Sequence, residues 1–129
     1  MSSVLDLSAM RDAARSILGD HARLPTEEQL ELLTGRLRGH LMLAIPVVVE
    51  AAAGYPVGDI PGACARVGVE EARLRLGREP AATSLPAGIA HAQLLARSVM
   101  ALCDHYESLT HPMEERRGPR HASDAGTSP

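Results

Sequence analysis

The segment "LCDHYESL", residues 102–109, brings together side chains that can act as nucleophiles, acids and bases. A thiolate beside an imidazole forms a nucleophile–base pair, so Cys103 and His105 are the first candidates for covalent catalysis. Two positions apart on a helix, however, these side chains point about 160° away from each other. We therefore interpret Cys103 as a small packed side chain and predict no catalytic residue in this segment.

The six histidines also suggest metal chemistry. His91 and His105 are fourteen positions apart, which separates them by about 21 Å along a helix and prevents them from sharing one ion. The sequence contains no HxxxH, HExxH or CxxC spacing, and no P-loop or GxGxxG motif. We therefore predict no metal and no cofactor. Cys64 and Cys103 could form one bridge at most, and we expect them to be reduced.

Glu50 is a single acid at the end of the most apolar segment, "HLMLAIPVVVE". At 100° per residue it lies about 140° from the stripe containing Leu37, alongside Leu43 and Val47, so it does not face the main core. A partly buried carboxylate needs a partner, and we predict a structural ion pair with Arg73 or Arg97.

The nine uncharged residues before Glu50 fall short of the roughly 20 needed to cross a bilayer. The first segment carries charges at Asp6, Arg11 and Asp12 in place of the apolar core of a signal peptide. We expect a cytoplasmic protein with no membrane partner.

Residues 60–78 are compatible with a DNA-binding helix-turn-helix. In that interpretation Gly68 forms the turn, and Arg73 and Arg75 face DNA from the second helix. Glu70 and Glu71 would lie in the first turn of that helix, where the negatively charged phosphates approach. Glu71 is better explained by an i,i+4 ion pair with Arg75. The net charge of −3 also disfavours nucleic acid as a partner. The motif is kept as an alternative.

Helical periodicity dominates the sequence, and no strand-like alternation is sustained. Apolar residues from Leu7 to Ile17 predict a first helix. Thr26 and Gln29 have the spacing of a capping box and predict the start of a second helix. Pro46 should kink or split this helix near Met42.

A third helix is predicted after Asp59 and runs to Leu76, and Ser84 could cap a fourth that runs to Leu109. We predict an all-α antiparallel bundle of about four helices over residues 1–109. Residues 110–129 are polar, rich in Pro and Gly and without periodicity, which predicts a disordered tail.

The chain resembles an uncharacterised family of small actinobacterial proteins described only as natural-product-biosynthesis proteins. The likeness rests on "LRGHLMLAIPVVVEAAA", "GVEEARLRL" and above all "ARSVMALCDHYESL". The absence of Lys, Asn and Phe, beside abundant Ala, Gly, Arg and Leu, independently indicates a high-GC genome. The resemblance implies an association with specialised metabolism and no established activity or catalytic residue.

These observations favour a non-catalytic accessory or regulatory protein-interaction module. We expect a protein partner or a second copy of the chain, because the second half of the second helix is apolar around its circumference. The predicted contact residues are Leu43, Val47 and Tyr106. A second alternative is a small enzyme or ligand carrier with a pocket between helices, whose polar groups would be Glu50, His91 and Tyr106.

Overall fold

The computed structural model describes residues 4–20 and 22–111, and within these ranges the protein is built from four α-helices without strands. The helices are α1 (Leu7–Leu18), α2 (Glu27–Ala53), α3 (Ile60–Leu76) and α4 (Leu85–Thr110). The all-α prediction is confirmed. The predicted tail lies almost wholly outside the described residues, although α4 itself continues to Thr110.

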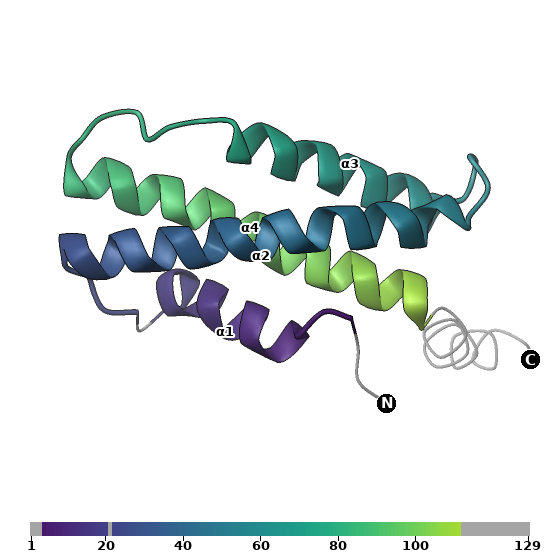
Figure 1. The fold of residues 1–129 in the computed structure, drawn as a ribbon, viewed down its shortest axis with the longest axis horizontal. Coiled ribbons are helices and arrows are strands. Elements are labelled where there is room, and N and C mark those ends of the chain that lie inside the picture. The colour runs from purple at the N-terminus through teal and green to yellow at the C-terminus, as the bar shows by residue number, and fades with distance from the viewer. Residues whose placement is uncertain (1–3, 21, 112–129) are drawn as a thin grey trace, which may run out of the picture.

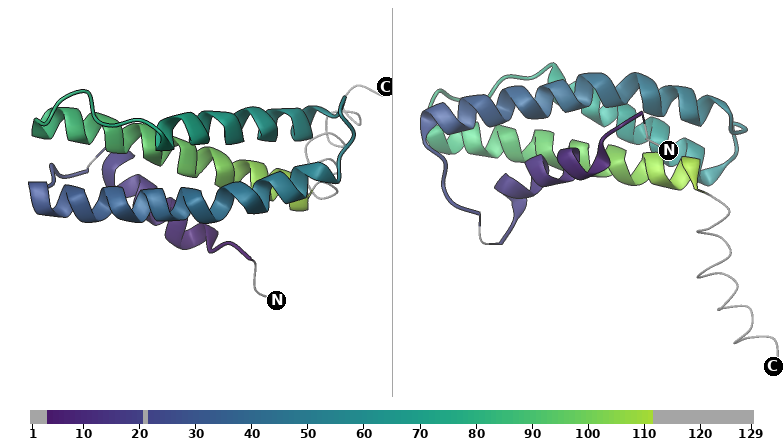
Figure 2. Two further views of the ribbon diagram at one scale, coloured as in Figure 1. Left: turned by 45° about the horizontal axis from the view of Figure 1, so that its top comes forward. Right: turned by 60° about the horizontal axis from the view of Figure 1, so that its bottom comes forward.

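Consecutive helices run in opposite directions, so α2 and α4 are parallel to each other and α1 and α3 run against them (Figure 1). The α2–α4 pair forms the middle of the bundle, with α1 on one side and α3 on the other (Figures 1 and 2). Among the described residues α4 contacts all three other helices, whereas α1 and α3 do not contact each other. α2 also contacts all three other helices, but its contact with α1 is the smallest, so α4 is the helix against which the others pack most extensively.

The predicted helix starts are confirmed in atomic detail. Thr26 Oγ1 accepts a hydrogen bond from the Gln29 amide at 3.1 Å, and Gln29 Oε1 accepts one from the Thr26 amide at 3.0 Å, which completes the capping box. The side chains of Asp59 and Ser84 cap α3 and α4 in the same way. These contacts satisfy amides that a helix leaves without a partner at its first turn.

Pro46 lies inside α2 without ending it, because the helix runs uninterrupted from Glu27 to Ala53. A proline in a helix leaves the carbonyl four residues earlier, here that of Met42, without an amide donor. Met42 and Pro46 are both exposed, so water can reach this part of the backbone. The cost of the missing hydrogen bond is reduced, and the helix continues.

The core is made of apolar side chains from all four helices, together with Leu5 before α1, and many of its members are alanines that let the helices approach closely. The largest fully buried hydrophobic residues are Leu5, Met10, Leu37, Leu41, Val48, Leu95, Val99, Leu102 and Cys103.

Arginines fix the ends and contacts of the helices. Arg66 donates to the carbonyl of Ala52 in the last turn of α2, at 3.0 Å, and to that of Tyr55 just after the helix, at 3.2 Å. Arg38 donates to the carbonyl of Leu76 at the end of α3. Carbonyls in the last turn of a helix have no amide partner within the helix, and a guanidinium can satisfy them. Part of the arginine content therefore has a structural use.

Gly68 lies in the middle of α3, where the helix passes close to α4. A Cβ atom at this position would come within 2.8 Å of the Cδ2 and Nε2 atoms of His105. We expect Gly68→Ala to destabilise the protein, or to leave its stability unchanged, although alanine in a helix interior normally gains about 1 kcal/mol over glycine. In a His105→Ala background the same change should be stabilising by up to about 1 kcal/mol.

Urea unfolding of Gly68→Ala, His105→Ala, the double variant and the wild type measures this coupling. Equal effects of Gly68→Ala in both backgrounds would contradict the close approach of α3 to His105.

Candidate interaction surface

α2 carries an apolar surface that the rest of the bundle does not cover. Leu37, Leu41, Ala44 and Val48 have no exposed surface and form the inner side of the helix. On the outer side, large apolar residues remain exposed to solvent: Leu32 by 67%, Met42 by 63%, Leu43 by 57% and Val49 by 41%. We call the stripe formed by residues 32, 35, 36, 39, 42, 43, 46 and 50 the outer face of α2.

The outer face is open at its glycines. A Cβ atom built at Gly35 or Gly39 would have no atom within 4 Å. These two glycines are one turn apart, between Leu32 and Leu43, so they leave a shallow stretch of bare backbone between two apolar side chains. Small residues at this spacing allow another helix to approach closely.

Two opposite charges border the outer face. Arg36, Leu43 and Glu50 are spaced by seven residues, which places them nearly in line on one side of α2. Arg36 and Glu50 are exposed, and neither forms an ion pair within residues 4–20 and 22–111. His40 lies beside the face, and burial, with Arg36 as a smaller cause, lowers its pKa below the ordinary 6.5. The lowered pKa favours the neutral form of His40.

The predicted ion pair of Glu50 is wrong in the described structure. Arg73 pairs instead with Glu70, at 2.7 Å on its own helix, and Arg97 is exposed on α4. The prediction assumed that Glu50 is partly buried, but its exposed carboxylate is hydrated and needs no internal partner.

The predicted contact residues do not share one surface. Leu43 lies on the outer face, whereas Val47 and Tyr106 are half-buried and pack against the core. His91, on the second turn of α4, is 9% exposed. It lies fifteen residues from Tyr106, about 22 Å along the helix, so the carrier pocket predicted from Glu50, His91 and Tyr106 is not assembled.

The helix-turn-helix alternative loses its structural basis, because residues 60–76 form one continuous helix without a turn at Gly68. Arg75 is directed into the bundle, where its Nη1 donates to Ser98 Oγ at 3.0 Å and to the Leu94 carbonyl at 3.2 Å. The predicted pair of Glu71 with Arg75 is confirmed at 3.3 Å. Arg75 is therefore not available to contact DNA.

Among the described residues, no three His, Cys, Asp or Glu side chains are grouped so that they could hold a metal ion. Cys103 is buried, and this burial raises the pKa of its thiol to about 11. A thiol with such a pKa is protonated at neutral pH and is a poor nucleophile. Cys64, on α3, is exposed, and both cysteines are free.

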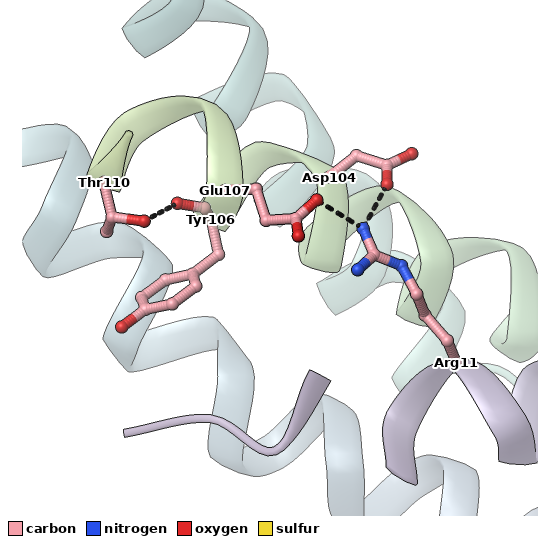
Figure 3. Close-up of polar contacts among 5 residues, drawn as sticks. All are labelled: Arg11, Asp104, Tyr106, Glu107 and Thr110. Carbon is pink, nitrogen blue, oxygen red and sulfur yellow. Dashed lines mark hydrogen bonds and ion pairs between the residues drawn. The ribbon is translucent and has the colours of Figure 1, made fainter. Parts of the chain in front are cut away.

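The contact that sequence reasoning missed joins α1 to α4. Arg11 Nη2 lies 2.6 Å from Asp104 Oδ1 and 2.8 Å from Glu107 Oε1 (Figure 3). These hydrogen bonds raise the pKa of Arg11 and lower that of Glu107. The sequence does contain one signal of this contact, since Asp104 and Glu107 are one turn apart and present two carboxylates to the same side.

The structure thus defines a small all-α protein with a covered core and an outer apolar helix face. The chain belongs to a family of unknown function, DUF6415, whose model matches residues 8–111. Comparison with curated proteins and with solved structures gives no match. The matched range spans all four helices except Leu7, the first residue of α1, so the family is defined by the bundle itself.

Proposed function

We propose that the protein is a non-catalytic accessory or regulatory module that acts by protein–protein interaction through the outer face of α2. The carrying observation is the exposure of Leu32, Met42 and Leu43 on one side of a helix whose other side is fully buried. By length and composition α2 could also cross a membrane, and only 28% of its most apolar window is buried, so binding to a membrane is the competing use of this surface. Exposed apolar surface of this kind is typical of interaction sites.

A second copy of the chain fits this surface best. Two α2 helices can pack antiparallel around a two-fold axis at Leu43. A residue that lies some positions after Leu43 on one helix then faces the residue that lies the same number of positions before Leu43 on the other. Arg36 then lies opposite Glu50 of the partner subunit, and the pairing occurs twice because the interface is symmetric. The two charges that have no ion pair within the described chain become partners across the interface.

Gly35 and Gly39 support the same arrangement, because the open space above them allows close packing of a second helix. Apolar side chains would fill the centre of such an interface, and the ion pairs would lie at its rim. Charges at a rim contribute more to the choice and orientation of a partner than to affinity.

Charge reversal tests the proposed dimer. We expect Arg36→Glu and Glu50→Arg each to weaken self-association by about tenfold, since each single reversal opposes like charges twice. The double variant restores opposite charges and should recover the wild-type dimerisation constant. Sedimentation equilibrium over a concentration series measures that constant, with Arg97→Glu, a reversal at an exposed position of α4, as the matched control.

A wild-type protein that is monomeric at millimolar concentration would contradict self-association. Mixing the same proteins with anionic or neutral lipid vesicles tests whether the outer face of α2 binds a membrane instead. Co-sedimentation that is lost in Leu43→Glu would assign the outer face to a membrane and overturn the proposal.

The resemblance to small actinobacterial natural-product-biosynthesis proteins supports a role for this module beside specialised metabolism in the cytoplasm. Affinity capture of wild type and Leu43→Glu from the host, with and without nuclease, tests this setting. A biosynthetic enzyme retained by the wild type and lost by the variant, whatever the nuclease treatment, is the expected result. Recovery that depends on nucleic acid would contradict it.

A further inference from the structure

A groove of about 770 Å³ lies between the first turns of α2, the α3–α4 connection and the start of α4. It is separate from the outer face of α2 and is independent of the dimer proposed above. Carboxylates line it on two sides: Glu27, Glu28 and Glu31 from α2, and Glu79 from the connection. Arg38 is its one lining cation among the described residues, and it already donates to the carbonyl of Leu76.

His91 gives this groove a second, independent feature of a binding site. Its side chain lines the groove, yet the residue is only 9% exposed and forms no hydrogen bond or ion pair in the described structure. No fully buried side-chain nitrogen or oxygen of the described residues lacks a hydrogen-bond partner. The ring nitrogens of His91 must therefore reach the groove, where they are free to bind a ligand.

The groove also has an apolar part. Leu30, Leu85 and Gly88 line it between the carboxylates. A Cβ atom at Gly88 would come within 2.8 Å of Leu30 Cδ2, so the glycine allows α4 to lie directly against α2 at this point. A ligand that fits must combine positive charge with an aliphatic chain.

We propose that this groove binds an elongated organic cation that carries ammonium or guanidinium groups on an aliphatic spacer. The carboxylates of α2 and Glu79 would each bind a cationic group, and a ring nitrogen of His91 would accept a hydrogen bond from one of these groups. The aliphatic spacer would lie on Leu30 and Leu85. A metal ion fits less well, because the described residues contain no group of three ligands that could hold one.

Titration calorimetry with spermidine and with agmatine at low ionic strength tests the proposal, with magnesium chloride at matched ionic strength as the comparison. We expect the organic cations to bind with a Kd below about 1 mM and magnesium to bind at least about tenfold more weakly. Glu31→Gln/Glu79→Gln should weaken spermidine binding by about fivefold or more. The matched control is Asp12→Asn/Asp20→Asn, which removes the same charge from exposed positions outside both the groove and the outer face of α2.

His91→Gln separates a specific site from general charge attraction, since it removes the ring without removing any carboxylate of the groove. We expect it to weaken binding while the melting temperature without ligand stays within a few degrees of the wild type. If the groove and control variants lost the same affinity for spermidine, or if magnesium bound as tightly as spermidine, the proposal would be overturned. No binding of either amine would also overturn it, and would leave the proposed dimer unaffected.

Discussion

Replacing Leu102 with alanine should remove about 2–5 kcal/mol from the free energy of unfolding. Leu102 has no exposed surface and lies on α4, the helix that packs most extensively against the other three. Its Cδ2 atom would be 3.8 Å from a Cβ at Gly68, so the side chain fills space between α4 and α3. Truncation removes its apolar contacts and leaves a cavity that three rigid helices can close only in part.

The matched control is Leu74→Ala, the same chemical change at a position of α3 that is 61% exposed. Its expected effect is within about 0.5 kcal/mol. Urea unfolding followed by far-ultraviolet circular dichroism measures both variants. Because small domains have a total stability of about 5–15 kcal/mol, the Leu102 variant should also melt at least about 10 °C lower. Similar losses in the two variants would show that the core is not centred on α4.

The second large effect is expected at Arg11, which joins α1 to α4 through Asp104 and Glu107 (Figure 3). Arg11→Met keeps the aliphatic stem of a side chain that is 18% exposed, and removes the guanidinium. We expect the free energy of unfolding to fall by about 1–2 kcal/mol. Two charge-assisted hydrogen bonds are lost, but each contributes less than a buried one because water reaches the two carboxylates. Arg15→Met, one turn further along α1, removes only a local 3.4 Å pair with Asp12 and should cost less than about 0.5 kcal/mol.

The cost of Arg11→Met should depend on pH with a defined sign. The hydrogen bond from Arg11 lowers the pKa of Glu107 in the folded protein below its ordinary value of 4.5. A carboxylate whose pKa is lowered on folding stabilises the protein above its unfolded pKa, and the contribution is lost as the pH falls through the folded pKa. The difference in free energy of unfolding between wild type and Arg11→Met should therefore be largest near pH 7 and become smaller below about pH 4.5. A difference that grows in acid would contradict this account.

Local signals in the sequence were sufficient to predict the helices. The capping box of Thr26 and Gln29 and the cap at Ser84 act within four residues, so each can be recognised from spacing alone. The alternative of a turn at Gly68 stayed open for the same reason. Glycine is compatible with a turn and with a close helix contact, and only the nearby His105 ring distinguishes them.

Contacts between distant segments could not be predicted in this way. Arg11 and Asp104 are 93 residues apart, and helical periodicity gives the side of each helix that is apolar without giving its neighbour. Glu50 was assigned an internal partner because the apolar run around it suggested burial. The structure places that run on α2 with one side uncovered, which the hydrophobic pattern of a single helix cannot reveal.

The position of α1 has a consequence for how the protein is made. α1 packs mainly on α4, although a ribosome releases α1 first and α4 last. Met10, Ala14 and Ile17, the buried side of α1, therefore stay without their final contacts until α4 has left the exit tunnel. We expect the apolar side of α1 to be available to chaperones in the nascent chain until then.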